Sequence, residues 1–178
     1  CARTFEHPDQ LLAARFMPDG RSIVTLCQDT ALRIWSREGA LERTVTLDEV
    51  PFNTEDRPAD LAIAGTSGSI AFGQATEVLV IDDAGDEIAR LPGDGSSVQG
   101  VELSSDGRSA LVTTASGRIA WWDVATATET VVREEGVAIF APRISANGTT
   151  VSVASDYSVL VFDSAFGLQD RHATSAAM

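Results

Sequence analysis

The sequence predicts an all-β fold made of repeated units, and two observations carry this prediction. Short runs rich in Val, Ile, Leu and Thr alternate along the chain with turns rich in Gly, Asp, Asn and Ser, as β-hairpins require. No segment keeps apolar residues at helical spacing over three turns. The pattern of four strands joined by three turns occurs four times, so each unit is expected to be a four-stranded antiparallel sheet.

The repeated units are assigned from their strand and turn patterns. They cover residues 11–47, 60–92, 93–134 and 135–172, followed by a tail at 173–178. The turn between the first two strands reads Pro-Asp-Gly at 18–20, Ser-Asp-Gly at 105–107 and Ala-Asn-Gly at 146–148. These residues favour tight turns because glycine adopts positive φ and Asp or Asn bonds to nearby backbone. The second unit is the weakest copy.

The spacing of equivalent positions identifies the type of repeat. The third strands are predicted to end at Trp35, Ile81, Trp122 and Phe162, which lie 46, 41 and 40 residues apart. A period of about 40 to 45 residues is typical of one β-propeller blade. The longer first interval contains an insertion at 48–59 that has two prolines and no strand periodicity. We therefore expect a β-propeller of four blades, each with four antiparallel strands.

The turns and third strands resemble those of the WD-repeat (Trp-Asp repeat) family. In this family an apolar residue precedes a Pro-Asp-Gly or Ser-Asp-Gly turn, as it does at 16–20 and 103–107, and the third strand ends in Trp-Asp. The third-strand ends that match or nearly match the dipeptide are Trp122-Asp123, Phe162-Asp163 and Trp35-Ser36. The copies are divergent, and a related propeller class without the Trp-Asp mark is the alternative.

The resemblance implies roles for several residues. In the family, a His before the first strand pairs with an Asp between the second and third strands. His7 and Asp29 occupy these places in the first unit, and Asp156 occupies the Asp place in the fourth. The aromatic residues Trp35, Trp121 and Trp122 at the ends of third strands are expected to pack between blades and not to stack on a ligand.

Residues 1–10 are interpreted as the fourth strand of a preceding blade or as a strand that closes the ring. Rings of the resembled family usually have about seven blades, within the range of about four to eight for propellers. The chain is therefore interpreted as part of a larger propeller. The alternatives are a small ring closed by this strand and two chains paired into one ring. An open propeller exposes strand edges that favour association with further blades or a second copy.

Composition excludes several kinds of partner. The net charge is −13, and all 13 basic residues are Arg, scattered among acidic residues. Nucleic acid is not an expected partner, because phosphate binding needs a basic face. Apolar runs such as 78–81 are far below the about 20 residues that cross a bilayer, so no membrane segment is expected. We predict an acidic, cytoplasmic protein, and the absence of Lys indicates a bacterial source.

The sequence indicates no cofactor and no metal. The two cysteines and two histidines lack zinc-ligand spacing, and no histidine accompanies a nucleophile motif. We therefore expect a protein that is not an enzyme. The alternative is a propeller hydrolase or lyase in which Asp29, Glu77 and Asp156 converge near the ring axis and hold a metal.

The leading functional prediction is a protein-protein interaction scaffold or sensor module. The insertion at 48–59 is expected on the rim that binds partners in the resembled family. Phe52 is a candidate apolar anchor, flanked by Glu55, Asp56 and Arg57. Aromatic and Arg side chains carry much of the energy of interfaces. A plain solvated loop is the alternative for this segment.

Overall fold

The computed structural model of the chain describes residues 4–47, 60–155, 158–163, 165 and 167–173. All regular elements in this part of the chain are β-strands, arranged as four antiparallel sheets of four strands each. None of its segments is a helix long and apolar enough to cross a membrane. The predicted all-β fold of four-stranded units is confirmed.

Each sheet is one blade, and its strands follow one another in chain order. Blade 1 contains β1 (Leu11–Phe16), β2 (Ser22–Cys27), β3 (Ala31–Ser36) and β4 (Leu41–Thr46). Blade 2 contains β5 (Leu61–Ile63), β6 (Ile70–Gln74), β7 (Glu77–Ile81) and β8 (Glu87–Pro92). Blade 3 contains β9 (Val98–Leu103), β10 (Ser109–Thr114), β11 (Arg118–Asp123) and β12 (Thr128–Glu134). Blade 4 contains β13 (Phe140–Ile144), β14 (Thr150–Ala154), β15 (Ser158–Asp163) and β16 (Leu168–Ala173).

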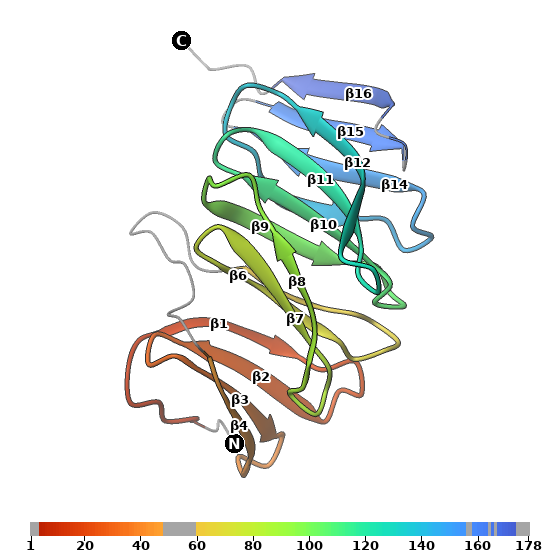
Figure 1. The fold of residues 1–178 in the computed structure, drawn as a ribbon. Coiled ribbons are helices and arrows are strands. Elements are labelled where there is room, and N and C mark those ends of the chain that lie inside the picture. Colours follow the sequence, from red (N-terminus) through yellow and green to blue (C-terminus); the bar gives the residue numbers. More distant parts are fainter. Residues whose placement is uncertain (1–3, 48–59, 156–157, 164, 166, 174–178) are drawn as a thin grey trace.

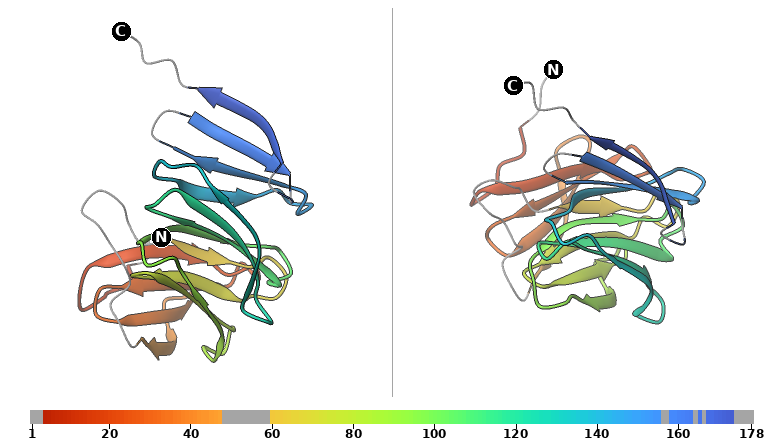
Figure 2. Two further views of the ribbon diagram at one scale, coloured as in Figure 1. Left: turned by 45° about the horizontal axis from the view of Figure 1, so that its top comes forward. Right: turned by 90° about the horizontal axis from the view of Figure 1, so that it is seen from above.

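The four blades lie side by side in an arc, with blades 1 and 4 at opposite ends (Figure 1). The first strands contact one another in the order β1, β5, β9 and β13, so they form one continuous side of the arc. We call these the inner strands. The views of Figure 2 show the same stacking of neighbouring sheets. This is the arrangement of β-propeller blades.

The ladders have the same register in all four blades. The last residues of the inner strands pair with the second strands as Phe16 with Ile23, Ile63 with Ile70, Leu103 with Ala110 and Ile144 with Val151. These second-strand residues pair in turn with Trp35, Ile81, Trp122 and Phe162. The four third-strand residues whose spacing indicated the repeat therefore hold the same place in their blades, and all four are buried.

The core is divided into three apolar layers, one between each pair of neighbouring blades. We call the side of a blade that faces the preceding blade its backward face, and the other side its forward face. The layer between blades 1 and 2 includes Val24, Leu26, Leu32 and Ile34 from the forward face of blade 1, and Ile70, Phe72, Leu79 and Ile81 from the backward face of blade 2. Burying each such side chain stabilises the fold by about 1.5–3 kcal/mol.

The other two layers repeat this arrangement. Val101, Leu103, Ala110, Val112 and Trp122 of blade 3 pack on Ala62, Ala64, Ala71, Val78 and Val80 of blade 2. Val151, Val153, Leu160 and Phe162 of blade 4 pack on Leu111 and Ile119 of blade 3. Alternate residues of a strand thus pack against different neighbouring blades, because successive side chains point to opposite faces of the sheet.

The backward face of blade 1 is covered by the N-terminal segment and not by a blade. Residues 4–7 of this segment lie outside the strands of blade 1, and the interpretation of residues 1–10 as the fourth strand of a preceding blade or as a ring-closing strand stays a prediction. Phe5 and His7 pack edge-on against Trp35, with ring centroids 5.5 Å and 5.3 Å from the indole. These residues lie across the face of the sheet, where the sheet offers no free backbone groups for strand pairing.

Candidate functional site

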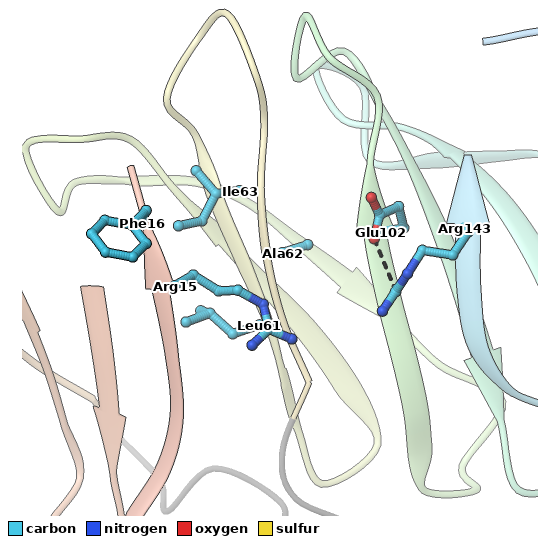
Figure 3. Close-up of a pocket in the computed structure, with 7 residues that line it drawn as sticks. All are labelled: Arg15, Phe16, Leu61, Ala62, Ile63, Glu102 and Arg143. Carbon is cyan, nitrogen blue, oxygen red and sulfur yellow. Dashed lines mark hydrogen bonds and ion pairs between the residues drawn. The ribbon is translucent and has the colours of Figure 1, made fainter. Parts of the chain in front are cut away.

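A groove of about 260 Å³ opens on the inner strands (Figure 3). Its lining residues are Arg15 and Phe16 from β1, Leu61, Ala62 and Ile63 from β5, Glu102 from β9, and Arg143 from β13. Every blade contributes its inner strand. The groove is therefore formed by the arc as a whole and cannot exist in a single blade.

The shared register explains why these residues meet. Because Phe16, Ile63, Leu103 and Ile144 are equivalent, the residues immediately before them are equivalent as well. These are Arg15, Ala62, Glu102 and Arg143, which we call the groove tier. Alanine is the smallest of the four side chains, so blade 2 leaves room between the charged groups of its neighbours.

The two arginines of the groove tier are only partly engaged. Arg143 Nη1 donates to Glu102 Oε2 at 3.2 Å and to the Pro142 carbonyl at 2.7 Å. Arg15 Nη1 donates to the Ala14 carbonyl at 3.0 Å, and its Nη2 lies 4.0 Å from Asp60 Oδ1. A guanidinium carries five N–H donors, so several donors on each arginine lack a partner among the described residues.

These two side chains also stay in contact with solvent. The exposed fractions are 49% for the Arg15 side chain and 55% for the Arg143 side chain. Figure 3 shows Arg15 extending from β1 past Leu61, while Arg143 extends from β13 toward Glu102. Both cationic groups are thus held at the groove and are accessible there.

Asp60 ties blade 2 to blade 3 beside the groove. Its Oδ1 accepts a hydrogen bond from the Leu61 N–H at 3.1 Å, and its Oδ2 accepts one from the Val101 N–H at 3.2 Å. This carboxylate is mostly buried. Its oxygens are therefore used within the fold.

Glu102 is the half-buried acid of the groove tier. Burial raises the pKa of Glu102, and the neighbouring Asp60 carboxylate raises it further, whereas Arg143 and Arg15 lower it. The net effect is a pKa above the ordinary value, because removal from water disfavours the charged form. The surroundings of Glu102 therefore disfavour its charged form.

The two described acids of the alternative enzyme prediction, Asp29 and Glu77, do not line this groove. Asp29 binds Arg33 through both carboxylate oxygens, and the hydrogen bond from Arg33 lowers the pKa of Asp29. Glu77 accepts a hydrogen bond from Arg90 Nη1 at 3.0 Å. Asp156 lies outside the described residues. Within the described part of the chain, no three His, Cys, Asp or Glu side chains form a group that could hold a metal.

His7 has partners other than Asp29. Its Nδ1 donates to the Phe5 carbonyl at 3.0 Å, and its Nε2 lies 2.8 Å from Thr25 Oγ1. The Trp35 indole N–H donates to the same hydroxyl at 2.9 Å. The His7–Asp29 pair implied by the resemblance is thus replaced, because the guanidinium of Arg33 holds Asp29 bidentately. Thr25 was missed by sequence reasoning, although a Thr among apolar strand residues was the available signal.

The acid of the Trp-Asp dipeptide closes the turn to the fourth strand. Asp123 Oδ1 accepts hydrogen bonds from the Thr126 N–H and hydroxyl, and these bonds lower the pKa of Asp123. Asp163 Oδ1 accepts hydrogen bonds from the backbone of Ala165 and Gly167. Asp82 accepts one from the Asp86 N–H. The recurring acid is therefore a turn residue and not a ligand-binding group.

The sequence-predicted interface falls outside what the structure describes. Phe52, Glu55, Asp56 and Arg57 all lie in the undescribed segment 48–59, so their role stays a prediction. The groove was not predicted from the sequence. Its residues belong to four separate units, and only the ladder register brings them to one level.

Comparison with known proteins bears on the first blade. No curated protein matches the chain. Residues 1–36 match the family model described as WD domain, G-beta repeat. The described part of this segment includes β1, β2 and β3 together with His7, Thr25 and Trp35. This match covers one blade, so the first blade is similar to a WD repeat, and the other three blades repeat its arrangement of strands.

Proposed function

We propose that the chain is a protein-protein interaction scaffold or sensor module with no catalytic activity of its own. WD repeats generally mediate contacts between proteins, and residues 1–36 match that repeat. The described acids Asp29 and Glu77 are held by arginines of their own blades, which leaves them unsuited to a shared catalytic centre. The cytoplasmic location and bacterial source stay predictions.

The observation that carries the proposal is the exposure of Phe16 at the groove. Its equivalents Ile63, Leu103 and Ile144 all pack against the preceding blade, whereas 65% of Phe16 is exposed. A large exposed aromatic ring beside Arg15 combines the two residue types that dominate binding energy at interfaces. Phe16 is therefore the residue most suited to anchor a partner.

Site-specific photo-crosslinking tests this proposal. A benzoylphenylalanine at position 16 is expected to form adducts with a protein from an extract of the source organism. The matched control carries the same group at Ile88, an exposed apolar residue of the outer strand β8.

The mass of each adduct identifies what was captured. A partner protein joined at position 16 but not at position 88 supports the scaffold function. No adducts at position 16, or identical adducts at both positions, would contradict it. Adducts whose mass is that of two chains would replace the proposal with self-association.

A further inference from the structure

We infer that the groove binds a carboxylate group of a peptide partner, held between Arg15 and Arg143 above Ala62. This inference rests on the proposed scaffold function and names the chemistry that the groove selects. It is carried by the balance of donors and acceptors, by the dimensions of the groove and by its apolar lip.

The donors of the groove exceed its acceptors. Arg15 and Arg143 each bond through part of the guanidinium, which leaves N–H groups available to a ligand. The Asp60 oxygens already accept two backbone N–H groups. A ligand that completes this arrangement must bring acceptors, and a negatively charged acceptor gives the strongest bonds to a guanidinium.

Glu102 is the internal group that competes for this position. It accepts from Arg143 at 3.2 Å, so part of that guanidinium is already occupied. Its surroundings raise the pKa of Glu102, so the folded protein disfavours the charged form of this group more than that of an exposed carboxylate. A carboxylate that a partner supplies from the solvent side of the groove therefore has an advantage over Glu102.

The size of the groove indicates a side chain and not a whole small molecule. Pockets that take drug-sized ligands have volumes of about 300–1,000 Å³, whereas this groove has about 260 Å³. Ala62 sets the depth, because a larger residue at this level of the groove tier would occupy the space. The fit is to one acidic side chain projecting from an extended peptide.

The lip of the groove defines the residues next to that acid. Phe16 and Ile63 both line the groove and are apolar. A strongly acidic polymer is repelled by the net charge of −13. The preferred peptide therefore carries one or two acidic residues flanked by apolar ones.

A defined probe tests this chemistry. The probe is the acetylated and amidated pentapeptide Leu-Glu-Leu-Glu-Leu, titrated into the full ¹⁵N-labelled chain while the arginine Nε–H signals are recorded by NMR. The signals of Arg15 and Arg143 are expected to shift and to saturate. The matched peptide Leu-Gln-Leu-Gln-Leu is expected to produce no saturable shift, and equal shifts with both peptides would overturn the inference.

Four variants make the test specific. Arg15→Gln and Arg143→Gln are each expected to weaken binding of the acidic probe at least tenfold. Arg90→Gln is the matched control, because Arg90 is also ion-paired but lies on the outer strand β8, and its variant should bind as the wild type does. Glu102→Gln is expected to tighten binding several-fold by releasing Arg143. Weaker binding by Glu102→Gln, or unchanged binding by both groove variants, would contradict the inference.

The two proposals fail in distinguishable ways. If photo-crosslinking from position 16 succeeds while the acidic probe does not discriminate, the scaffold function stands and the carboxylate inference falls. If the probe binds as expected but no partner is captured, the groove chemistry stands and the scaffold function falls. Near-ultraviolet circular dichroism of each variant verifies that the blades remain packed.

Discussion

Blades 1 and 3 have the same backbone register but cover their backward faces in different ways. The Gln28 N–H donates to the Gln10 carbonyl in blade 1, as the Ala115 N–H donates to the Ser97 carbonyl in blade 3. The segments that lead into the two inner strands are therefore equivalent. Blade 3 is covered by blade 2, whereas blade 1 is covered by the short segment that carries Phe5 and His7.

Whether the residue at the centre of a backward face is polar or apolar depends on what packs against that face. In blade 3 the position equivalent to Thr25 is Val112, which packs on apolar residues of blade 2. In blade 1 the Thr25 hydroxyl bonds to His7 and to the indole of Trp35. The short covering segment is thus combined with hydrogen bonds at this position, and a covering blade is combined with apolar packing.

In blade 3 the polar contacts join the segment before β9 to the turn between β10 and β11, at the rim of the sheet. Asp94 is the counterpart of His7, and Ser116 is the counterpart of Asp29. The Ser116 hydroxyl donates to Asp94 Oδ2 at 2.6 Å, so the two positions that are unpaired with each other in blade 1 are joined in blade 3. Blades 1 and 3 thus place their polar contacts at different positions while keeping the same backbone register.

The largest expected difference concerns the two equivalent tryptophans. Trp122→Ala should cost about 3–5 kcal/mol, because it opens a cavity in a layer shared by two sheets. Trp35→Ala should cost about 2–3 kcal/mol, since residues 4–10 can collapse into the space. Guanidinium denaturation measures both free energies of unfolding. Equal losses would show that the segment is as rigid a cover as a blade.

A second pair compares the ends of the inner strands. Leu103→Ala should lose about 2–4 kcal/mol, because Leu103 is 5% exposed and packs on blade 2. Phe16→Ala at the equivalent place should change stability by less than about 0.5 kcal/mol, as for other exposed sites. The same denaturation experiment gives both values. A large loss for Phe16→Ala would mean that its ring is covered in solution.

A third variant removes the polar centre of blade 1. Thr25→Val leaves the Trp35 indole N–H without its acceptor, which should cost about 1–3 kcal/mol. Thr113→Val is the matched control, because this buried hydroxyl makes only a long bond of 3.5 Å to the Gly100 carbonyl. Similar losses for the two isosteric changes would refute a special role for the Thr25 network.

The smallest effect is a pH dependence at the rim of blade 3. Burial alone would raise the pKa of Asp94, but hydrogen bonds from Ser116, Ser96 and Thr114 outweigh it and lower the pKa from 3.8 to about 2. A depressed pKa stabilises the fold at pH values above the ordinary pKa of the group. This contribution is lost as the pH falls toward 2. Asp94 is exposed, so the contribution should be below about 1 kcal/mol.

The Asp94→Asn variant measures this contribution. Its stability should fall below that of the wild type at pH 7, and the difference should shrink between about pH 4 and pH 2. Ser116→Ala should reduce the same pH dependence, since it removes one of the donors. A constant difference across this pH range would rule out the proposed linkage.

The repeat was predictable because turn chemistry recurs locally. Gly20, Gly107 and Gly148 have φ values of 64°, 73° and 70° and occupy the same place in three turns, where side chains are disfavoured. In blade 2 the positive-φ glycine of this turn is Gly68, one place later, and no Asp precedes it. This difference explains why the second unit was the weakest copy.

The polar contacts were less predictable than the repeat. Thr25 and Arg33 were not recognised as partners of His7 and Asp29, because strand periodicity shows which face a residue occupies but not what covers that face. The groove depends on residues from four blades that are far apart in the sequence. Its identification required the ladder register, which turn and strand patterns do not provide.

The division of the core into three layers affects how the molecule comes apart. Each layer joins only two adjacent sheets, so stability is expected to add up from neighbour to neighbour, as in other repeat proteins. Blades 2 and 3 contribute to two layers each, whereas blades 1 and 4 contribute to one. Amide hydrogens should therefore exchange slowest in the middle sheets, and opening should begin at either end and travel inward one blade at a time.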